Sequence, residues 1–239
     1  MNPALEIRDV AASYGPFRAL FGVSLTVPAG GSLALLGSNG AGKTSVARVA
    51  SGLVAPTSGS VRVDGDDLTG ARPYRYAQAG VAHAPEGRSV FATLTVGENL
   101  TLAFRRAYGA SGVPGALDHA YELFPRLAER RSQMAGTLSG GEQRMLSMAR
   151  VLVATPKVLI ADELSLGLAP IIIDEVYRTL QTILEAGTAL LIVEQQVGHA
   201  LELCDRVAVL SHGVVKWEGP STEATDVVVG QVFTSDEDG

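Results

Sequence analysis

The sequence predicts an α/β fold with a mostly parallel sheet. Short apolar runs of strand length alternate with helical stretches along the whole chain, which is typical of a parallel sheet covered by helices. At roughly 150 residues per domain, a chain of 239 residues suits one compact domain with an appended lobe. We expect a single domain over 1–239, with a core over about 1–94 and 132–219, a helical lobe over about 95–131 and an acidic C-terminal tail over about 221–239.

The N-terminal half alternates strands with one helix. Strands are expected at the apolar runs 5–10, 23–27, 32–36, 60–63 and 81–84. A helix is expected over 43–51, because Gly52 stands where glycine commonly ends a helix.

The C-terminal half continues this alternation beyond the lobe, which we expect to be helical apart from a glycine-rich loop over 109–115. Helices are expected over 141–154 and over 171–185, the second opened by Pro170. Strands are expected at 157–161, 189–193, 206–210 and 214–218. Strand, helix and strand in that order imply a right-handed crossover between parallel strands, and the last two strands suit a hairpin.

The composition argues against nucleic-acid binding and against a membrane span. The net charge is −6 and the pI about 5.2, whereas a nucleic-acid-binding domain normally carries a basic excess. No apolar run approaches the ~20 residues that cross a bilayer. Glu6 and Asp9 stand where a signal peptide would be basic and then apolar, and the single cysteine, Cys204, excludes an internal disulfide. We expect a cytoplasmic chain, held at a membrane only through other subunits.

The segment 37–44, G-S-N-G-A-G-K-T, is called here the phosphate loop. It fits G-x-x-x-x-G-K-[ST] and lies between an apolar strand and a helix. Its backbone N–H groups and the positive helix end would bind phosphate oxygens, while Lys43 would reach the β and γ phosphates and Thr44 would bind Mg²⁺. The residues expected to hold a nucleoside triphosphate are Gly37, Ser38, Asn39, Gly40, Ala41, Gly42, Lys43, Thr44 and Ser45.

An acid pair, Asp162 and Glu163, directly follows the apolar run 158–161. In an open parallel sheet ligands bind at the carboxyl ends of the strands, so both acids would face the phosphate loop. Asp162 could then hold Mg²⁺ through water. Glu163 could orient or deprotonate the water that attacks the γ-phosphate. The alternative is a helix-entry acid without chemistry.

The signature segment, L-S-G-G-E-Q at 138–143, precedes a helix. Ser139 and Glu142 form the S-x-x-E pattern of a capping box. An ordinary helix start explains these two residues but not the adjacent glycines, which cost a helix about 1 kcal/mol each. Bare N–H groups at a positive helix end indicate a phosphate ligand.

With this segment the sequence resembles the ATP-binding cassette (ABC) ATPases, whose signature is L-S-G-G-Q or L-S-G-G-E. In that family the phosphate loop of one subunit and the signature of a second subunit sandwich one ATP, so Ser139, Gly140 and Gly141 would bind ATP held by the partner. The resemblance spans about 5–219. It implies a P-loop NTPase of the ABC type, with a mostly parallel sheet core, an N-terminal antiparallel β portion and a helical lobe. It also places Tyr14 at the aromatic that stacks on adenine; the alternative is a strand-end aromatic.

Further segments resemble the smaller ATP-binding subunit of branched-chain amino acid importers. They are A-P-E-G-R at 84–88 with Phe91, L-T-V-G-E-N-L at 94–100, S-L-G-L-A-P at 165–170 and V-E-Q-Q at 193–196. This resemblance implies an ATPase that powers import of branched-chain or other hydrophobic amino acids, with ATP and Mg²⁺ as cofactors. The alternatives are a transporter ATPase for another solute, such as urea or a lipid, and a soluble ABC ATPase of DNA repair or the ribosome.

Two positions depart from the residues usual in the family. Glu86 stands in place of the glutamine that senses Mg²⁺ and the attacking water, and Gln195 in place of the histidine that contacts the γ-phosphate. A carboxylate can still bind Mg²⁺, and an amide can still donate a hydrogen bond but cannot become cationic. In addition, Leu164 replaces a usual proline and Ala169 an aspartate that couples the two sites. The resemblance thus implies catalytic roles for Lys43, Glu163 and Gln195, and metal binding by Thr44, Glu86 and Asp162.

The family also implies partners. These are a second ATP-binding subunit, identical or homologous, membrane-spanning permease subunits and, indirectly, a periplasmic or extracellular solute-binding protein. The segment 86–100, with Arg88 and Phe91, is the expected docking surface for the permease, and core packing by Phe91 and Leu94 is the alternative. The four histidines share no metal-ligand spacing and are expected to be structural or surface residues: His83, His119, His199 and His212.

Overall fold

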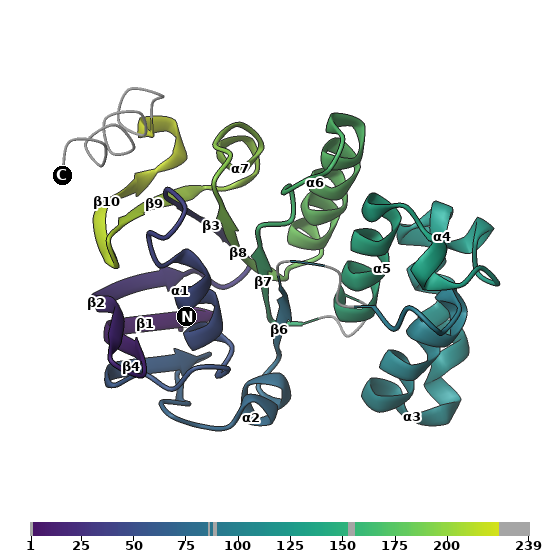
Figure 1. Cartoon of the computed structure of the whole chain (residues 1–239). Coiled ribbons are helices and arrows are strands. Elements are labelled where there is room, and N and C mark those ends of the chain that lie inside the picture. The colour runs from purple at the N-terminus through teal and green to yellow at the C-terminus, as the bar shows by residue number, and fades with distance from the viewer. Residues whose placement is uncertain (1, 86, 88–89, 153–155, 225–239) are drawn as a thin grey trace.

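In the computed structural model, which describes residues 2–85, 87, 90–152 and 156–224, the strands form two sheets (Figure 1). The first is antiparallel and has the order β2-β1-β4-β5. Its strands are β1 (Leu5–Tyr14), β2 (Phe17–Val27), β4 (Ser58–Val63) and β5 (Asp66–Asp67). The N-terminal antiparallel portion implied by the resemblance is therefore present.

The second sheet has the order β10-β9-β3-β8-β7-β6. Its strands are β3 (Ser32–Leu36), β6 (Val81–Ala84), β7 (Val158–Asp162), β8 (Ala189–Glu194), β9 (Arg206–Ser211) and β10 (Val214–Pro220). Every neighbouring pair is parallel except the β9–β10 hairpin. The predicted α/β class, with a mostly parallel core sheet, is confirmed.

Helices lie both between the two sheets and on the side of the molecule away from the antiparallel sheet. Helix α1 (Lys43–Ala50) lies between the two sheets, where Val46 and Val49 are buried in the same apolar core as Leu5 and Leu33. Figure 1 shows α3, α4 and α5 on the side of the molecule away from the antiparallel sheet, and α3 and α4 belong to the lobe. The remaining bounds are α2 (Pro73–Gln78), α3 (Val96–Leu123), α4 (Pro125–Glu129), α5 (Gly140–Leu152), α6 (Pro170–Glu185) and α7 (Gly198–Leu203), with short 3-10 turns at Ala135–Thr137 and Ser221–Glu223.

The predicted loop over 109–115 is wrong. Helix α3 runs through it, and only Gly109 leaves helical geometry, with φ 70° and ψ 178°. Glycine adopts that backbone without steric cost and so allows a kink between two helical segments. Pro114 lies inside the second helical segment, five residues after Gly109, where it removes one hydrogen bond of the helix.

Two short helices, α2 and α7, were not expected from the sequence. Helix α5 begins at Gly140, one residue before the expected start. The acidic tail lies outside the described residues from position 225 on. Among the described residues, no helix combines the length and apolar character needed to span a membrane.

Candidate functional site

The carboxyl ends of three adjacent parallel strands build the site. Strand β8 lies between β3 and β7, with Leu36 opposite Glu194 and Asp162 opposite Val193. The phosphate loop follows β3, the acid pair follows β7 and Gln195 follows β8. Segments more than a hundred residues apart in the sequence therefore meet at one edge of the sheet, which is where ligands bind in open parallel sheets.

The phosphate loop needs glycine for two separate reasons. Gly40 and Gly42 have φ of 83° and 104°, a region that other residues rarely adopt. At Gly37 the limit is space, because a Cβ there would lie 2.4 Å from the backbone oxygen of Leu210. The loop then passes into α1, whose N-terminal N–H groups and positive dipole favour an anion at this point.

Lys43 and Glu163 face each other across the site. The Nζ of Lys43 donates to the backbone oxygen of Ser38 at 3.0 Å and lies 3.3 Å from Oε1 of Glu163. Glu163 has a φ of 47°, and its backbone N–H donates to Val193 at 2.8 Å. These contacts hold the carboxylate within reach of the phosphate loop, which suits a group that orients or deprotonates an attacking water.

Arg144 supports this arrangement from α5. Its guanidinium donates to the backbone oxygens of Glu163 and Gly87, each at 3.0 Å, and the residue is 6% exposed. The side chain therefore joins the loop after β6 to the loop after β7. The sequence alone does not single it out, because an arginine on a predicted amphipathic helix carries no sign of its partners.

Thr44 and Asp162 offer oxygen ligands of the kind that Mg²⁺ prefers. The hydroxyl of Thr44 lies 3.5 Å from Oδ1 of Asp162, whose residue is 1% exposed. Mg²⁺ is usually held by one or two such protein groups together with phosphate oxygens and water, so these residues fit the ion. The third expected ligand, Glu86, lies outside the described residues.

His83 lies next to the carboxylate of Asp162. Its Nδ1 is 3.1 Å from the hydroxyl of Ser51, and its Nε2 is 3.9 Å from Oδ2 of Asp162. Burial, with a smaller contribution from Arg48, lowers the pKa of His83 to about 4. The imidazole is therefore neutral at physiological pH and adds no positive charge beside Asp162.

A cleft of ≈ 580 Å³ opens beside the phosphate loop, and Tyr14 lies at its wall together with Lys43, Thr44, Ser45 and Glu163. The cleft wall also holds side chains that sequence reasoning missed: Arg18, Phe21 and His212. The guanidinium of Arg18 lies 4.8 Å from the centre of the Phe21 ring. Phe21 reaches the cleft because its backbone N–H donates to Gly213 at 2.9 Å, a contact between distant segments that no local pattern reveals.

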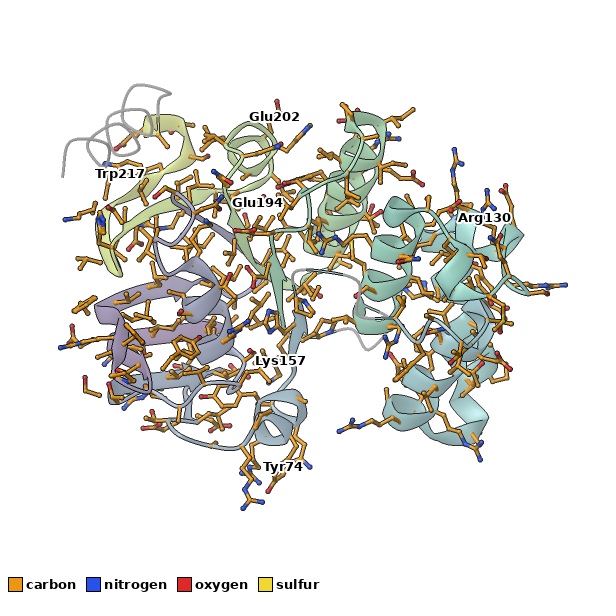
Figure 2. All side chains as sticks on the ribbon, viewed as in Figure 1. Tyr74, Arg130, Lys157, Glu194, Glu202 and Trp217 are labelled. Atoms are coloured by element: carbon orange, nitrogen blue, oxygen red, sulfur yellow. The ribbon has the colours of Figure 1, made fainter. Side chains whose placement is uncertain are left out.

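The signature segment forms the predicted capping box at the start of α5. The backbone N–H of Ser139 donates to Glu142 at 2.9 Å, and the backbone N–H of Glu142 returns to the Ser139 hydroxyl at 3.3 Å. Arg130, labelled on the lobe in Figure 2, lies 2.6 Å from the same carboxylate and ties α5 to the lobe. Among the described residues that line the cleft, none belongs to the signature segment, so Ser139, Gly140 and Gly141 are separate from the site of their own chain.

Gln195 is exposed directly after β8 and is also absent from the described residues that line the cleft. Leu164, in contrast, is buried in the apolar core at 2% exposure. Ala169 is exposed immediately before α6.

Comparison with known proteins decides the family. The sequence model of the family described as ABC transporter matches residues 20–165. The chain belongs to the ABC transporter family. Its enzymatic class is that of the family's ATP-binding subunits, which are ATPases coupled to transport, as the resemblance implied.

Relatives of known function align with most of this chain. The branched-chain amino acid transport ATP-binding protein BraG of Pseudomonas aeruginosa is 41% identical over 87% of this chain and 89% of its own length. The lipopolysaccharide export ATP-binding protein LptB of Escherichia coli is 32% identical over 92% of this chain and 91% of its own length. A solved structure described as the ATP-binding subunit of an ABC transporter superposes with a TM-score of 0.80 at 29% identity, covering 91% of this chain and 90% of that one.

Proposed function

We propose that this ABC ATPase powers the import of branched-chain or other hydrophobic amino acids. The observation that carries the proposal is the higher identity to the branched-chain transport relative than to the lipopolysaccharide-export relative. Specificity for the solute resides in other chains, so the proposal concerns the assembly in which this subunit works. Export of a lipid is the second candidate, because the lipopolysaccharide-export relative also aligns over most of the chain.

In the proposed reaction, the phosphate loop binds the triphosphate through its N–H groups and Lys43 neutralises charge on the β and γ phosphates. Glu163 holds the attacking water and receives its proton, and Gln195 donates a hydrogen bond toward the γ-phosphate. Thr44 and Asp162 would hold Mg²⁺, which supplies charge neutralisation at the phosphate oxygens. Positioning and electrostatics of this kind supply most of the catalysis of phosphoryl transfer.

We propose further that the complete site needs two subunits. Ser139 is exposed, and the backbone N–H groups at the start of α5 suit a phosphate presented by a second chain. ATP would then join the two subunits and hydrolysis would release them. Size-exclusion mass of the Glu163→Gln variant tests this, with a dimer expected only when ATP and Mg²⁺ are both present. A variant that binds ATP and stays monomeric would mean that two such subunits alone do not complete the site.

The segment after β6 is the proposed docking surface for permease subunits, through which the chain would lie at the inner face of the membrane. Phe91 is 47% exposed, so it is not the core residue of the alternative interpretation, and the guanidinium of Arg150 lies 4.8 Å from its ring centre. Buried Asn99 fixes the turn beneath it, accepting from the backbone N–H of Phe91 at 2.9 Å and donating to its oxygen at 3.0 Å. Arg88, the other residue expected here, lies outside the described residues.

The solute is tested in cells of the source organism that carry Lys43→Ala in place of the wild-type chain. Uptake of labelled leucine, isoleucine and valine should fall to the background of a deletion strain, while uptake of labelled urea stays unchanged. Loss of surface lipopolysaccharide with normal leucine uptake would favour the lipid candidate instead. Lys157→Ala, a surface lysine that pairs with Asp64 away from the cleft, is the matched control.

A further inference from the structure

A buried carboxylate at the end of β8 is not used by the proposed reaction. Glu194 is 2% exposed at the end of β8, and Figure 2 labels it among the side chains near the strands of the larger sheet. Its Oε1 accepts from the backbone N–H of Ser165 at 2.9 Å, and its Oε2 accepts from the Ser165 hydroxyl at 2.7 Å. The backbone N–H of Gln195 and the hydroxyl of Tyr177 are further donors to the same carboxyl group.

The carboxyl group uses both of its oxygens, one toward the backbone N–H of Ser165 and one toward the Ser165 hydroxyl. Burial raises the pKa of Glu194, and the hydrogen bonds from Ser165 and Gln195 oppose that rise. A carboxyl group buried in this way is costly to desolvate, and an apolar side chain of similar size would fill the space at lower cost. A role that depends on the hydrogen bonds to Ser165 explains a glutamate at position 194 better than packing does.

The partners of Glu194 connect two parts of the site. Ser165 lies two residues after Glu163, in the loop that leads from the acid pair to α6. Gln195 is the residue expected to face the γ-phosphate. One carboxyl group thus connects the loop after β7 to the end of β8, and a shift of the loop after β7 would break its two hydrogen bonds to Ser165.

We propose that Glu194 is a positioning residue, which holds the loop after Glu163 and the backbone of Gln195 in one fixed arrangement for hydrolysis. The proposal rests on the roles given above to Glu163 and Gln195. It predicts a specific kinetic pattern. Loss of Glu194 should slow the chemical step and spare nucleotide binding, because the phosphate loop keeps its own contacts.

The test measures kcat, KM and the equilibrium affinity for ATP in the full-length chain and its variants. Glu194→Ala should lower kcat by about tenfold to a hundredfold, since small misplacements of reacting groups have effects of this size, and should change ATP affinity less than threefold. Glu194→Gln should recover part of kcat, because its amide can still accept from the Ser165 N–H and donate to the Ser165 hydroxyl. Ser165→Ala should lower kcat less than Glu194→Ala, and adding it to Glu194→Ala should cost little more.

Thr188→Ala is the matched control. Thr188 is buried just before the other end of β8, where its hydroxyl donates to the backbone oxygen of Pro156 at 2.9 Å. This variant loses a comparable buried hydrogen bond far from the acid pair and should keep the wild-type kcat. Equal kcat in Glu194→Ala and Thr188→Ala, or a parallel loss of kcat and ATP affinity, would overturn the proposal.

If Glu194→Ala does not fold, Glu194→Gln and Ser165→Ala test the proposal in its place. A wild-type kcat in both variants would overturn the positioning role of Glu194. Failure of the proposed ATPase function would give a different result in the same assays. In that case wild type would bind ATP without hydrolysing it, or Glu163→Gln would hydrolyse ATP at the wild-type rate.

Discussion

The ammonium group of Lys43 and the carboxylate of Glu163 form an ion pair at 3.3 Å, with side chains that are only 3% and 12% exposed. A triphosphate bound in the phosphate loop would compete with Glu163 for this ammonium group. The carboxylate therefore opposes nucleotide binding while it serves the proposed hydrolysis. A substitution of Glu163 should therefore change ATP affinity and kcat in opposite directions.

Glu163→Gln should bind ATP more tightly and hydrolyse it far more slowly. Removing the competing charge should tighten ATP roughly threefold to tenfold, as expected for a partly screened ion pair worth about 1 kcal/mol. Losing the general base should lower kcat by about 10² to 10⁴. Titration calorimetry and a phosphate-release assay measure the two quantities. Glu122→Gln, on the exposed face of the lobe, controls for the change in net charge, and weaker ATP binding by Glu163→Gln would contradict the competition.

Gln195 should give the enzyme a pH–rate profile without the ionisation of a catalytic histidine. An amide does not titrate, so kcat should show no step near pH 6.5 that depends on this residue. Gln195→His should introduce such a step, and Gln195→Ala should lower kcat without changing the shape of the profile. Initial rates from pH 5.5 to 8.5 at saturating ATP measure this. A step near pH 6.5 in wild type that disappears in Gln195→Ala would refute the prediction.

Local patterns were enough to locate the phosphate loop and the acid pair. The phosphate loop and the acid pair could be found because each stands at the end of an apolar strand, and because the spacing of the glycines and the lysine is typical of loops that bind phosphate. The adjacency of β3 and β8 was different, because these two strands are not consecutive in the chain. The residues predicted that the acid pair faces the phosphate loop and that a crossover joins β7 to β8, but no pattern in the sequence placed β8 between β3 and β7.

Residues with long-range partners escaped sequence reasoning. Glu194 ends an apolar run and has the pattern of an ordinary strand end, since its bonds to Ser165 span 29 residues. Phe21 gave no signal because its backbone N–H bonds to Gly213, in the turn between β9 and β10. The lobe was expected to be helical, but the continuation of α3 through 109–115 was missed for the opposite reason. The local preference of the glycines and Pro114 for a loop is overridden by packing of Leu100, Phe104 and Ala120 in the core.

Gly52 should be among the least replaceable glycines outside the site. Its φ is 71°, and a Cβ there would lie 2.3 Å from the ring of Tyr76, which is buried and donates from its hydroxyl to Leu68 at 2.8 Å. Gly52→Ala should lower the free energy of unfolding by about 2 to 5 kcal/mol, from backbone strain and overpacking together. Gly70→Ala is the matched control, since Gly70 has a φ of 67° and open space around it, and should cost only the strain of about 1 to 2 kcal/mol. Urea denaturation compares the two, and equal losses would show that the Tyr76 contact is relieved at no cost.

Cys204 should be unreactive in the folded protein. The residue is 3% exposed, and burial, with a further contribution from Asp205, raises the pKa of its thiol to about 12. The thiolate is the nucleophile, so at pH 8 the folded chain holds almost none of the reactive form, whereas an unfolded cysteine with a pKa of about 8.5 holds a substantial share. A disulfide reagent at pH 8 should therefore label native protein slowly and label one thiol per chain in urea, because the sequence has a single cysteine. Thr222→Cys adds an exposed thiol as an internal standard, and native labelling of Cys204 at the rate of that thiol would mean that the segment between α7 and β9 opens readily.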